Sequence, residues 1–125
     1  IVGKPDKEQK KIYQVVKDAH DKATEAVRPG VKASSIDFVA RDFIKKAGYG
    51  KYFSHGTGHG VGLAVHEWPN ISPYNDNTIE EGMVFTIEPG IYIPGWGGIR
   101  IEDMILVTKD SHEVLTETSK EMTVL

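Results

Sequence analysis

Apolar residues recur with a helical period in the first third of the chain. Asp6 and Gln9 form the pattern of a capping box, and Pro29-Gly30 ends the periodic stretch. This pattern predicts a first helix from about Lys7 to Arg28. His20 lies beside the apolar stripe, so we expect a surface or boundary position and assign it no role. The stripe comprises Ile12, Val15, Val16, Ala19, Ala23, Ala26 and Val27.

A second amphipathic pattern follows directly. Either Ser34 or Ser35 is expected to cap a helix that Gly48 ends. Each predicted helix has one apolar face to cover, and the strands predicted in the second half of the chain offer the only other large apolar surface. We therefore expect an α+β fold in which two amphipathic helices pack on a mainly antiparallel sheet. The second stripe comprises Ile36, Val39, Ala40, Phe43, Ile44 and Ala47.

Residues 83 to 107 have the composition of a β-hairpin. β-Branched and aromatic residues dominate Met83 to Ile93 and Ile99 to Val107, and the turn-forming residues Pro94 to Gly98 join these arms. With the fold-back at Gly95, simple pairing would place two glutamates, at positions 88 and 102, opposite each other. Like charges across a ladder destabilise a sheet, so this pair needs a positive partner such as a metal ion.

Two alternatives remain open for that hairpin. Glu88 and Glu102 can be solvated side chains, as carboxylates in strands usually are. Pro89 cannot donate to a ladder, so a bulge can shift the register. Elsewhere, we expect a surface loop at 70–81, and a short return strand from His112 to Thr116 with His112 in solvent. Ile1-Val2 resembles the end of a strand.

Composition narrows the function classes. The 125 residues fit one domain, and a formal charge of −3 with a pI near 5.9 gives no reason to expect a nucleic-acid partner. The chain has no cysteine, so any metal must be held by nitrogen and oxygen ligands. No apolar run reaches membrane-spanning length, and we expect a cytoplasmic protein without a membrane partner.

Residues 55 to 66, HGTGHGVGLAVH, combine three histidines with four glycines. Imidazole is a common metal ligand, and glycine lets the backbone approach a ligand closely. The stretch contains no His-Glu-x-x-His, and its glycines miss the spacing of a nucleotide-binding loop because Val61 stands at the third position. Each histidine alone favours a structural role, but together with two inward-facing glutamates they favour a metal site.

Three motifs carry a family resemblance: HGTGHGVGLAVHEWP, EEGMVFTIEPGIY and GIRIEDMILVT. In this order they resemble the C-terminal part of the catalytic domain of Xaa-Pro peptidases, the prolidase and aminopeptidase P branch of the pita-bread metallopeptidases. The resemblance implies that residues 1–125 form the C-terminal portion of a pita-bread catalytic domain. It also implies hydrolysis of Xaa-Pro bonds in a dipeptide, or in a peptide with proline at the second position.

The resemblance assigns roles to particular residues. It implies that His59, Glu88 and Glu102 hold metal, with Glu88 close to the nucleophilic water and Glu102 bridging two divalent ions of manganese, cobalt or zinc. His66 and His55 are implied in the substrate site, where His66 is placed to stabilise the oxyanion. Arg100 is implied to orient an acidic group.

One departure from the family pattern concerns two further ligands. The family takes these from aspartates in a strand pair before the segment that resembles residues 1–5, so we expect this chain alone to be incomplete and inactive. The alternative is a pita-bread module that binds peptides or proteins without catalysis. A homodimer is compatible with either function.

Overall fold

The computed structural model describes all 125 residues, beginning with two helices. Helix α1 spans Lys7–Glu25, and its predicted capping box is confirmed: Asp6 accepts from the Gln9 amide at 2.8 Å, and the Gln9 side chain accepts from the Asp6 amide at 2.9 Å. The helix ends before the predicted Arg28. Pro29 disfavours helical geometry in the residue that precedes it, and the Val27 amide already bonds Thr24 in a tighter turn.

Helix α2 spans Ala33–Lys46, and the prediction that Ser34 or Ser35 caps it is wrong. Lys32 occupies the cap position without a side-chain bond. Two amides of the first turn instead donate to backbone carbonyls of residues 75 and 77, at 2.7 and 3.0 Å. At the other end Gly48, at φ +93°, closes the helix: its amide bonds Lys45, and the next amide bonds Ile44.

The strands are antiparallel and form two sheets. The five-stranded sheet has the order β2-β1-β3-β6-β7, and β4 pairs with β5 in a separate ribbon. A short 3-10 helix, Gly50–Tyr52, precedes the strands. The strand bounds are β1 Gly58–Gly60, β2 Glu67–Ile71, β3 Val84–Ile87, β4 Gly90–Ile93, β5 Gly97–Arg100, β6 Asp103–Val107 and β7 His112–Val114.

The predicted hairpin is split into two ladders, so the prediction of two continuous arms is wrong. Pairing stops after Ile87↔Asp103 and resumes at Gly90↔Arg100, on either side of Pro89, which has no amide hydrogen to donate. Both ladders nevertheless keep one register. Counting inward from either ladder places Glu88 across from Glu102, as the fold-back at Gly95 predicts.

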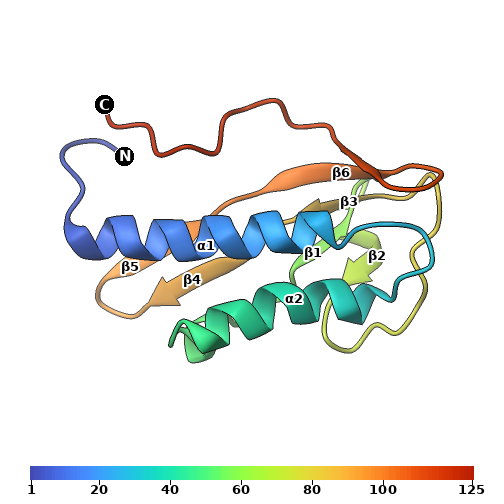
Figure 1. The fold of residues 1–125 in the computed structure, drawn as a ribbon, viewed down its shortest axis with the longest axis horizontal. Helices are drawn as coiled ribbons and strands as arrows, with labels where there is room; N and C mark the ends of the chain where they lie inside the picture. The colour runs from blue at the N-terminus through green and yellow to red at the C-terminus, as the bar shows by residue number, and fades with distance from the viewer.

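Both helices cover one face of the strands (Figure 1). Phe85, Ile87 and Ile105 are fully buried within the hydrophobic core that includes residues of both helices. Alternate residues point to the opposite face of a strand, so Thr86 and Glu88 lie on the face away from the helices. The α+β architecture, with two helices on a mainly antiparallel sheet, is confirmed. Neither helix combines the length and apolar character needed to cross a bilayer.

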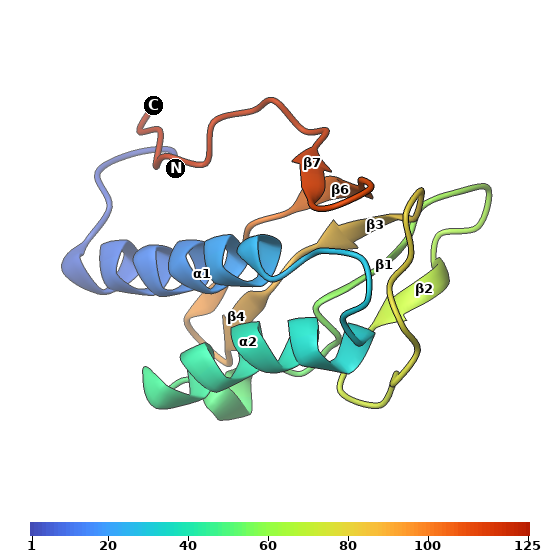
Figure 2. The same cartoon turned by 45° about the vertical axis from the view of Figure 1, so that its right-hand side comes forward.

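Two histidines lie deeper than predicted. His20 is only 3% exposed because α1 turns it toward the sheet, and His112 is half-buried with Nδ1 2.9 Å from the Val27 carbonyl. The C-terminal tail runs back past α1 to the N-terminus (Figure 2). Ile1-Val2 is not part of a strand, although the amides of Gly3 and Leu125 bond Leu125 and Ile1 respectively, each at 2.9 Å.

Candidate metal and substrate site

A cavity of about 540 Å³ lies where β1, the β1–β2 loop and the break in the hairpin converge. It contains five of the six residues singled out from the sequence; Glu102 is the exception and lies beside Arg100 at the rim. The structure therefore gathers residues from positions 55 to 102 at one place. The lining residues are His55, Gly56, Gly58, His59, His66, Glu67, Trp68, Asn70, Glu88 and Arg100.

A buried ion pair on α2 positions the loop that leads into β1. The Asp37 side chain is fully buried and accepts two bonds from the Arg41 guanidinium, at 2.7 and 2.9 Å. It also accepts from the amide and hydroxyl of Thr57, at 3.1 and 2.9 Å. Arg41 donates in turn to the carbonyls of Phe53 and His55, at 3.0 and 2.7 Å. A buried carboxylate satisfied in this way fixes the backbone beside the site.

Two of the glycines are required by the sheet itself. A Cβ at Gly58 would overlap the carbonyl oxygen of Thr86, and a Cβ at Gly60 would overlap that of Trp68. A Cβ at Gly62 would meet only the side chain of Glu67, which can move. On the sequence alone, the many glycines are interpreted as space for a ligand. Close approach between neighbouring strands accounts for part of them instead.

His59 faces Glu88 across the cavity floor. Its Nδ1 lies 2.9 Å from the Gly60 carbonyl oxygen, which can only accept, so we assign the ring proton to Nδ1. In the neutral ring the Nε2 lone pair then points at the Glu88 carboxylate, 3.1 Å away. Two acceptors at this distance need a shared proton or a cation between them. Thr86 holds the carboxylate in place by donating to Oε1 at 3.0 Å.

Arg100 stands between the two glutamates. Its Nε lies 3.6 Å from a carboxylate oxygen of Glu88 and 3.5 Å from one of Glu102. Partial burial, and then the neighbouring charge of Glu88, raise the pKa of Glu102 above its ordinary value even with Arg100 beside it. The pKa of Arg100 is raised, first through its hydrogen bond with Tyr92. The two carboxylates therefore make a site that favours additional positive charge.

The other two histidines differ in how firmly they are held. His55 has Nδ1 2.7 Å from the Gly56 carbonyl and Nε2 3.0 Å from the Tyr92 hydroxyl, so both ring nitrogens have partners. His66 is exposed, and its ring packs edge-on against His59 with centroids 4.7 Å apart. His66 thus borders the metal-ligand candidates, whereas His55 belongs to the wall that Tyr92 supports.

The nitrogen and oxygen donors suit divalent transition metals. His59 and Glu88 are close enough to share one ion, and Glu102 lies near Glu88, with the Arg100 Nε 3.5 Å from its carboxylate. The chain has no group of three or more His, Asp or Glu side chains that is already arranged to hold a metal. The donor chemistry fits a metal centre, while the number of assembled ligands is smaller than a structural or catalytic site uses.

Sequence reasoning missed several functional neighbours. Asp37 and Arg41 have the i,i+4 spacing of an ordinary surface ion pair, so the sequence does not distinguish this buried pair from an exposed one. Tyr92 lies in a predicted strand, and the strand pattern does not indicate its contact with His55. Trp68 and Asn70 line the cavity because β2 pairs with β1. The sequence around them is rich in turn-forming residues and does not predict this pairing.

Comparison with known proteins identifies the family. The metallopeptidase family M24 model matches residues 1–109. An Xaa-Pro dipeptidase of Pyrococcus horikoshii is 53% identical over 122 residues, and one of Lactobacillus helveticus is 52% identical over 123 residues; each match covers 98% of this chain. The crystal structure of the Pyrococcus horikoshii prolidase superposes with a TM-score of 0.95, over 98% of this chain and 35% of that one.

An X-Pro aminopeptidase of Thermotoga maritima gives a TM-score of 0.96 at 42% identity, over 99% of this chain and 35% of that chain. The family model covers residues 1–109 and so defines the class of protein to which this chain belongs. The chain belongs to the metallopeptidase family M24. Its relatives include Xaa-Pro dipeptidases, and the chain spans only 35% and 33% of the length of the two named above.

Proposed function

We propose that this chain forms part of the catalytic centre of an Xaa-Pro peptidase that works with two divalent metal ions. The observation that carries the proposal is the opposition of the His59 Nε2 lone pair and the Glu88 carboxylate at 3.1 Å, with Glu102 nearby. A cation between these groups would relieve the repulsion between their lone pairs and satisfy the unpaired charge. The relatives named as Xaa-Pro dipeptidases support the reaction class.

Within this proposal the chain supplies three ligands and a positioned frame. His59, Glu88 and Glu102 would hold the ions; manganese, cobalt or zinc would suit these ligands and would supply Lewis acidity and an activated water. The Gly60 carbonyl fixes the tautomer of His59 from behind, and Thr86 orients Glu88. His59 is thus held from the side away from Nε2, whereas Thr86 donates to the same Glu88 oxygen that faces His59.

The substrate would lie in the cavity of about 540 Å³. His66 is exposed on the cavity wall and can donate to the peptide carbonyl oxygen as negative charge develops there. His55, fixed by Tyr92, and Arg100 provide a polar wall that can bind the substrate and its carboxylate. The substrate class is an Xaa-Pro dipeptide, or a longer peptide with proline at the second position.

We also propose that the complete centre takes further ligands from residues outside these 125. Three protein ligands are few for two ions, and the chain spans about a third of the length of the relatives that it matches. The 125 residues alone would then be inactive.

The proposal is tested by replacing the three ligands one at a time in the full-length protein. Each of His59→Ala, Glu88→Ala and Glu102→Ala is expected to abolish Xaa-Pro hydrolysis and to lower metal content, measured by elemental analysis. His112→Ala is the matched control because it lies half-buried away from the cavity. His20→Ala is unsuitable as a control, because His20 is buried. Normal turnover in Glu102→Ala would contradict the proposal.

The second candidate function is a module that binds peptides without catalysis. The exposed apolar side chains of the β1–β2 loop favour a binding surface next to the cavity: Leu63 and Val65 are 107% and 82% exposed. Xaa-Pro peptide binding with unchanged affinity after chelation of metal, and without hydrolysis, would identify this function instead.

A further inference from the structure

Asp103 is a buried acidic residue on the side of the sheet opposite to the site. It follows Glu102 directly, and the alternation of a strand points the two side chains to opposite faces. Glu102 is 43% exposed at the rim of the site, whereas Asp103 is 4% exposed beneath α1. A carboxylate at this depth is costly unless it is paired.

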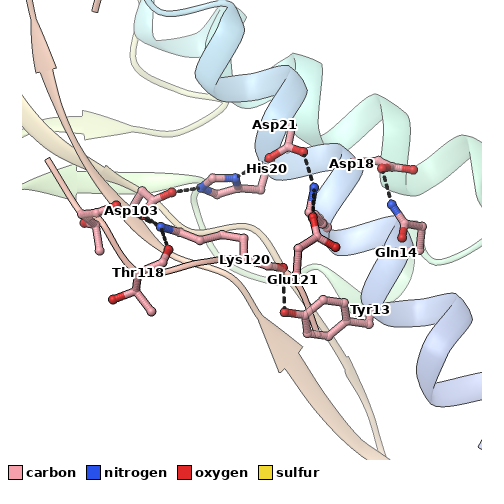
Figure 3. Close-up of polar contacts among 11 residues, drawn as sticks. Tyr13, Gln14, Asp18, His20, Asp21, Asp103, Thr118, Lys120 and Glu121 are labelled. Atoms are coloured by element: carbon pink, nitrogen blue, oxygen red, sulfur yellow. Dashed lines mark hydrogen bonds and ion pairs between the residues drawn. The ribbon is translucent and has the colours of Figure 1, made fainter. Parts of the chain in front are cut away.

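Two cations or potential cations from distant parts of the chain meet Asp103 (Figure 3). The His20 Nε2 of α1 lies 3.2 Å from one carboxylate oxygen, and Lys120 of the C-terminal tail contacts the other at 2.5 Å. Lys120 also donates to the carbonyls of Thr116 and Thr118, so its ammonium is fixed within the tail. Asp103 therefore joins the sheet to α1 and to the tail at one point.

The backbone around Glu102 is held by few hydrogen bonds. Glu102 lies in the break between β5 and β6, where neither ladder includes it. The amide of the preceding residue, Ile101, makes only a long 3.5 Å bond to Pro89. The first ladder pair after the break is Ile87↔Asp103. The Glu102 carboxylate is paired with Arg100 at the rim, and the position of its backbone depends on how firmly its neighbour Asp103 is anchored.

We propose that Asp103 is a positioning residue for Glu102, anchored by His20 and Lys120 so that the Glu102 carboxylate is held where it would contact metal. The inference rests on the proposed function, because it assumes that Glu102 is a ligand. It adds that the C-terminal tail acts on the metal centre through Lys120 and Asp103, from the opposite face of the sheet. Outer groups that orient a ligand typically change metal affinity on the order of tenfold or more when removed.

The test measures binding of Co²⁺ alone to the full-length protein and records the Co²⁺ absorption spectrum, which reports ligand geometry. Asp103→Asn is expected to weaken Co²⁺ binding about tenfold, to change the spectrum, and to lower kcat with little change in KM. Lys120→Met, which leaves the strand intact, is expected to act in the same direction to a smaller extent. Asp110→Asn, an exposed carboxylate in the following turn, is expected to change none of these.

Ile105→Val is the control for a purely structural role of Asp103. Ile105 is buried on the same face of β6. The substitution is expected to lower the unfolding temperature and to leave Co²⁺ affinity unchanged. If Asp103→Asn and Lys120→Met also change only the unfolding temperature, the inference is overturned while the proposed function stands. If the unaltered protein and Glu102→Gln bind Co²⁺ equally well, or neither binds it, both are overturned.

Discussion

Single residues in this site are held by hydrogen bonds that leave lone pairs of His59 and Glu88 facing each other. His59 gives its Nδ1 proton to a backbone carbonyl, and Glu88 accepts from Thr86, so the free lone pairs of both face the same space. Arg100 compensates part of the negative charge from the rim. Burial and the negative charge of Glu88 still raise the pKa of Glu102.

The raised pKa of Glu102 predicts a pH-dependent stability in the metal-free protein. A carboxyl whose folded pKa lies above its ordinary value of 4.5 holds its proton more tightly in the folded state, so its contribution to stability is lost as pH rises through the folded pKa. Glu102→Gln, which resembles the protonated form, should therefore stabilise the metal-free protein at about pH 7. The gain should not exceed about 1 kcal/mol, because solvent screens the half-exposed side chain.

Thermal unfolding of both proteins in chelator checks this prediction. The difference should disappear at about pH 3.5, below the ordinary pKa, where the glutamate is protonated in both folded and unfolded states. A stability loss in Glu102→Gln at neutral pH would show that the Arg100 ion pair outweighs burial.

His66 is predicted to act on substrate without holding metal. It is exposed on the cavity wall, and its only close aromatic neighbour is the candidate ligand His59. In the full-length protein His66→Ala should lower kcat by about two orders of magnitude and change KM little, because a hydrogen bond to the developing oxyanion is lost. Steady-state kinetics with elemental analysis of the same sample measures both. Loss of metal in proportion to activity would make His66 a ligand.

At the level of elements, α2 stabilises the site through Asp37. Asp37→Ala leaves the Arg41 guanidinium without its buried partner and frees Thr57, and should lower the free energy of unfolding by about 3–5 kcal/mol. The matched control on the same helix is Asp42→Ala. Asp42 is 30% exposed and paired only with the exposed Lys46, so its loss should cost at most about 0.5 kcal/mol. Urea denaturation compares the two, and equal effects would contradict the role of the network.

Elements with strong local signals were predictable from the sequence. The capping box at Asp6 and the helical stripes gave both helices, and the symmetric spacing about Gly95 gave the register of the hairpin. Short-range signals could not give β1 and β2, because three to five residues rich in glycine, tryptophan and proline carry no clear alternation. The burial of His20 depends on Asp103 and Lys120, about 80 and 100 residues away, and local pattern carries no such information.

At the scale of the whole molecule, the chain has no group of three or more His, Asp or Glu side chains placed to hold a metal ion. A protein of these 125 residues is expected to bind Mn²⁺ or Co²⁺ more weakly than micromolar, because the few ligands present do not repay dehydration of two ions. Isothermal calorimetry on this chain and on the full-length protein tests the expectation. Two ions bound per chain with micromolar affinity would show that the 125 residues are sufficient.

The alternation of faces along β3 and β6 separates two kinds of evolutionary constraint. Phe85, Ile87 and Ile105 pack in the core and are constrained by folding, while under the proposed function Thr86, Glu88 and Glu102 on the opposite face are constrained by catalysis. Substitutions at the first three positions should therefore mainly lower cellular abundance, and substitutions at the other three should mainly lower turnover. Under the same proposal, a descendant without catalysis would change at the second set of positions and keep its fold.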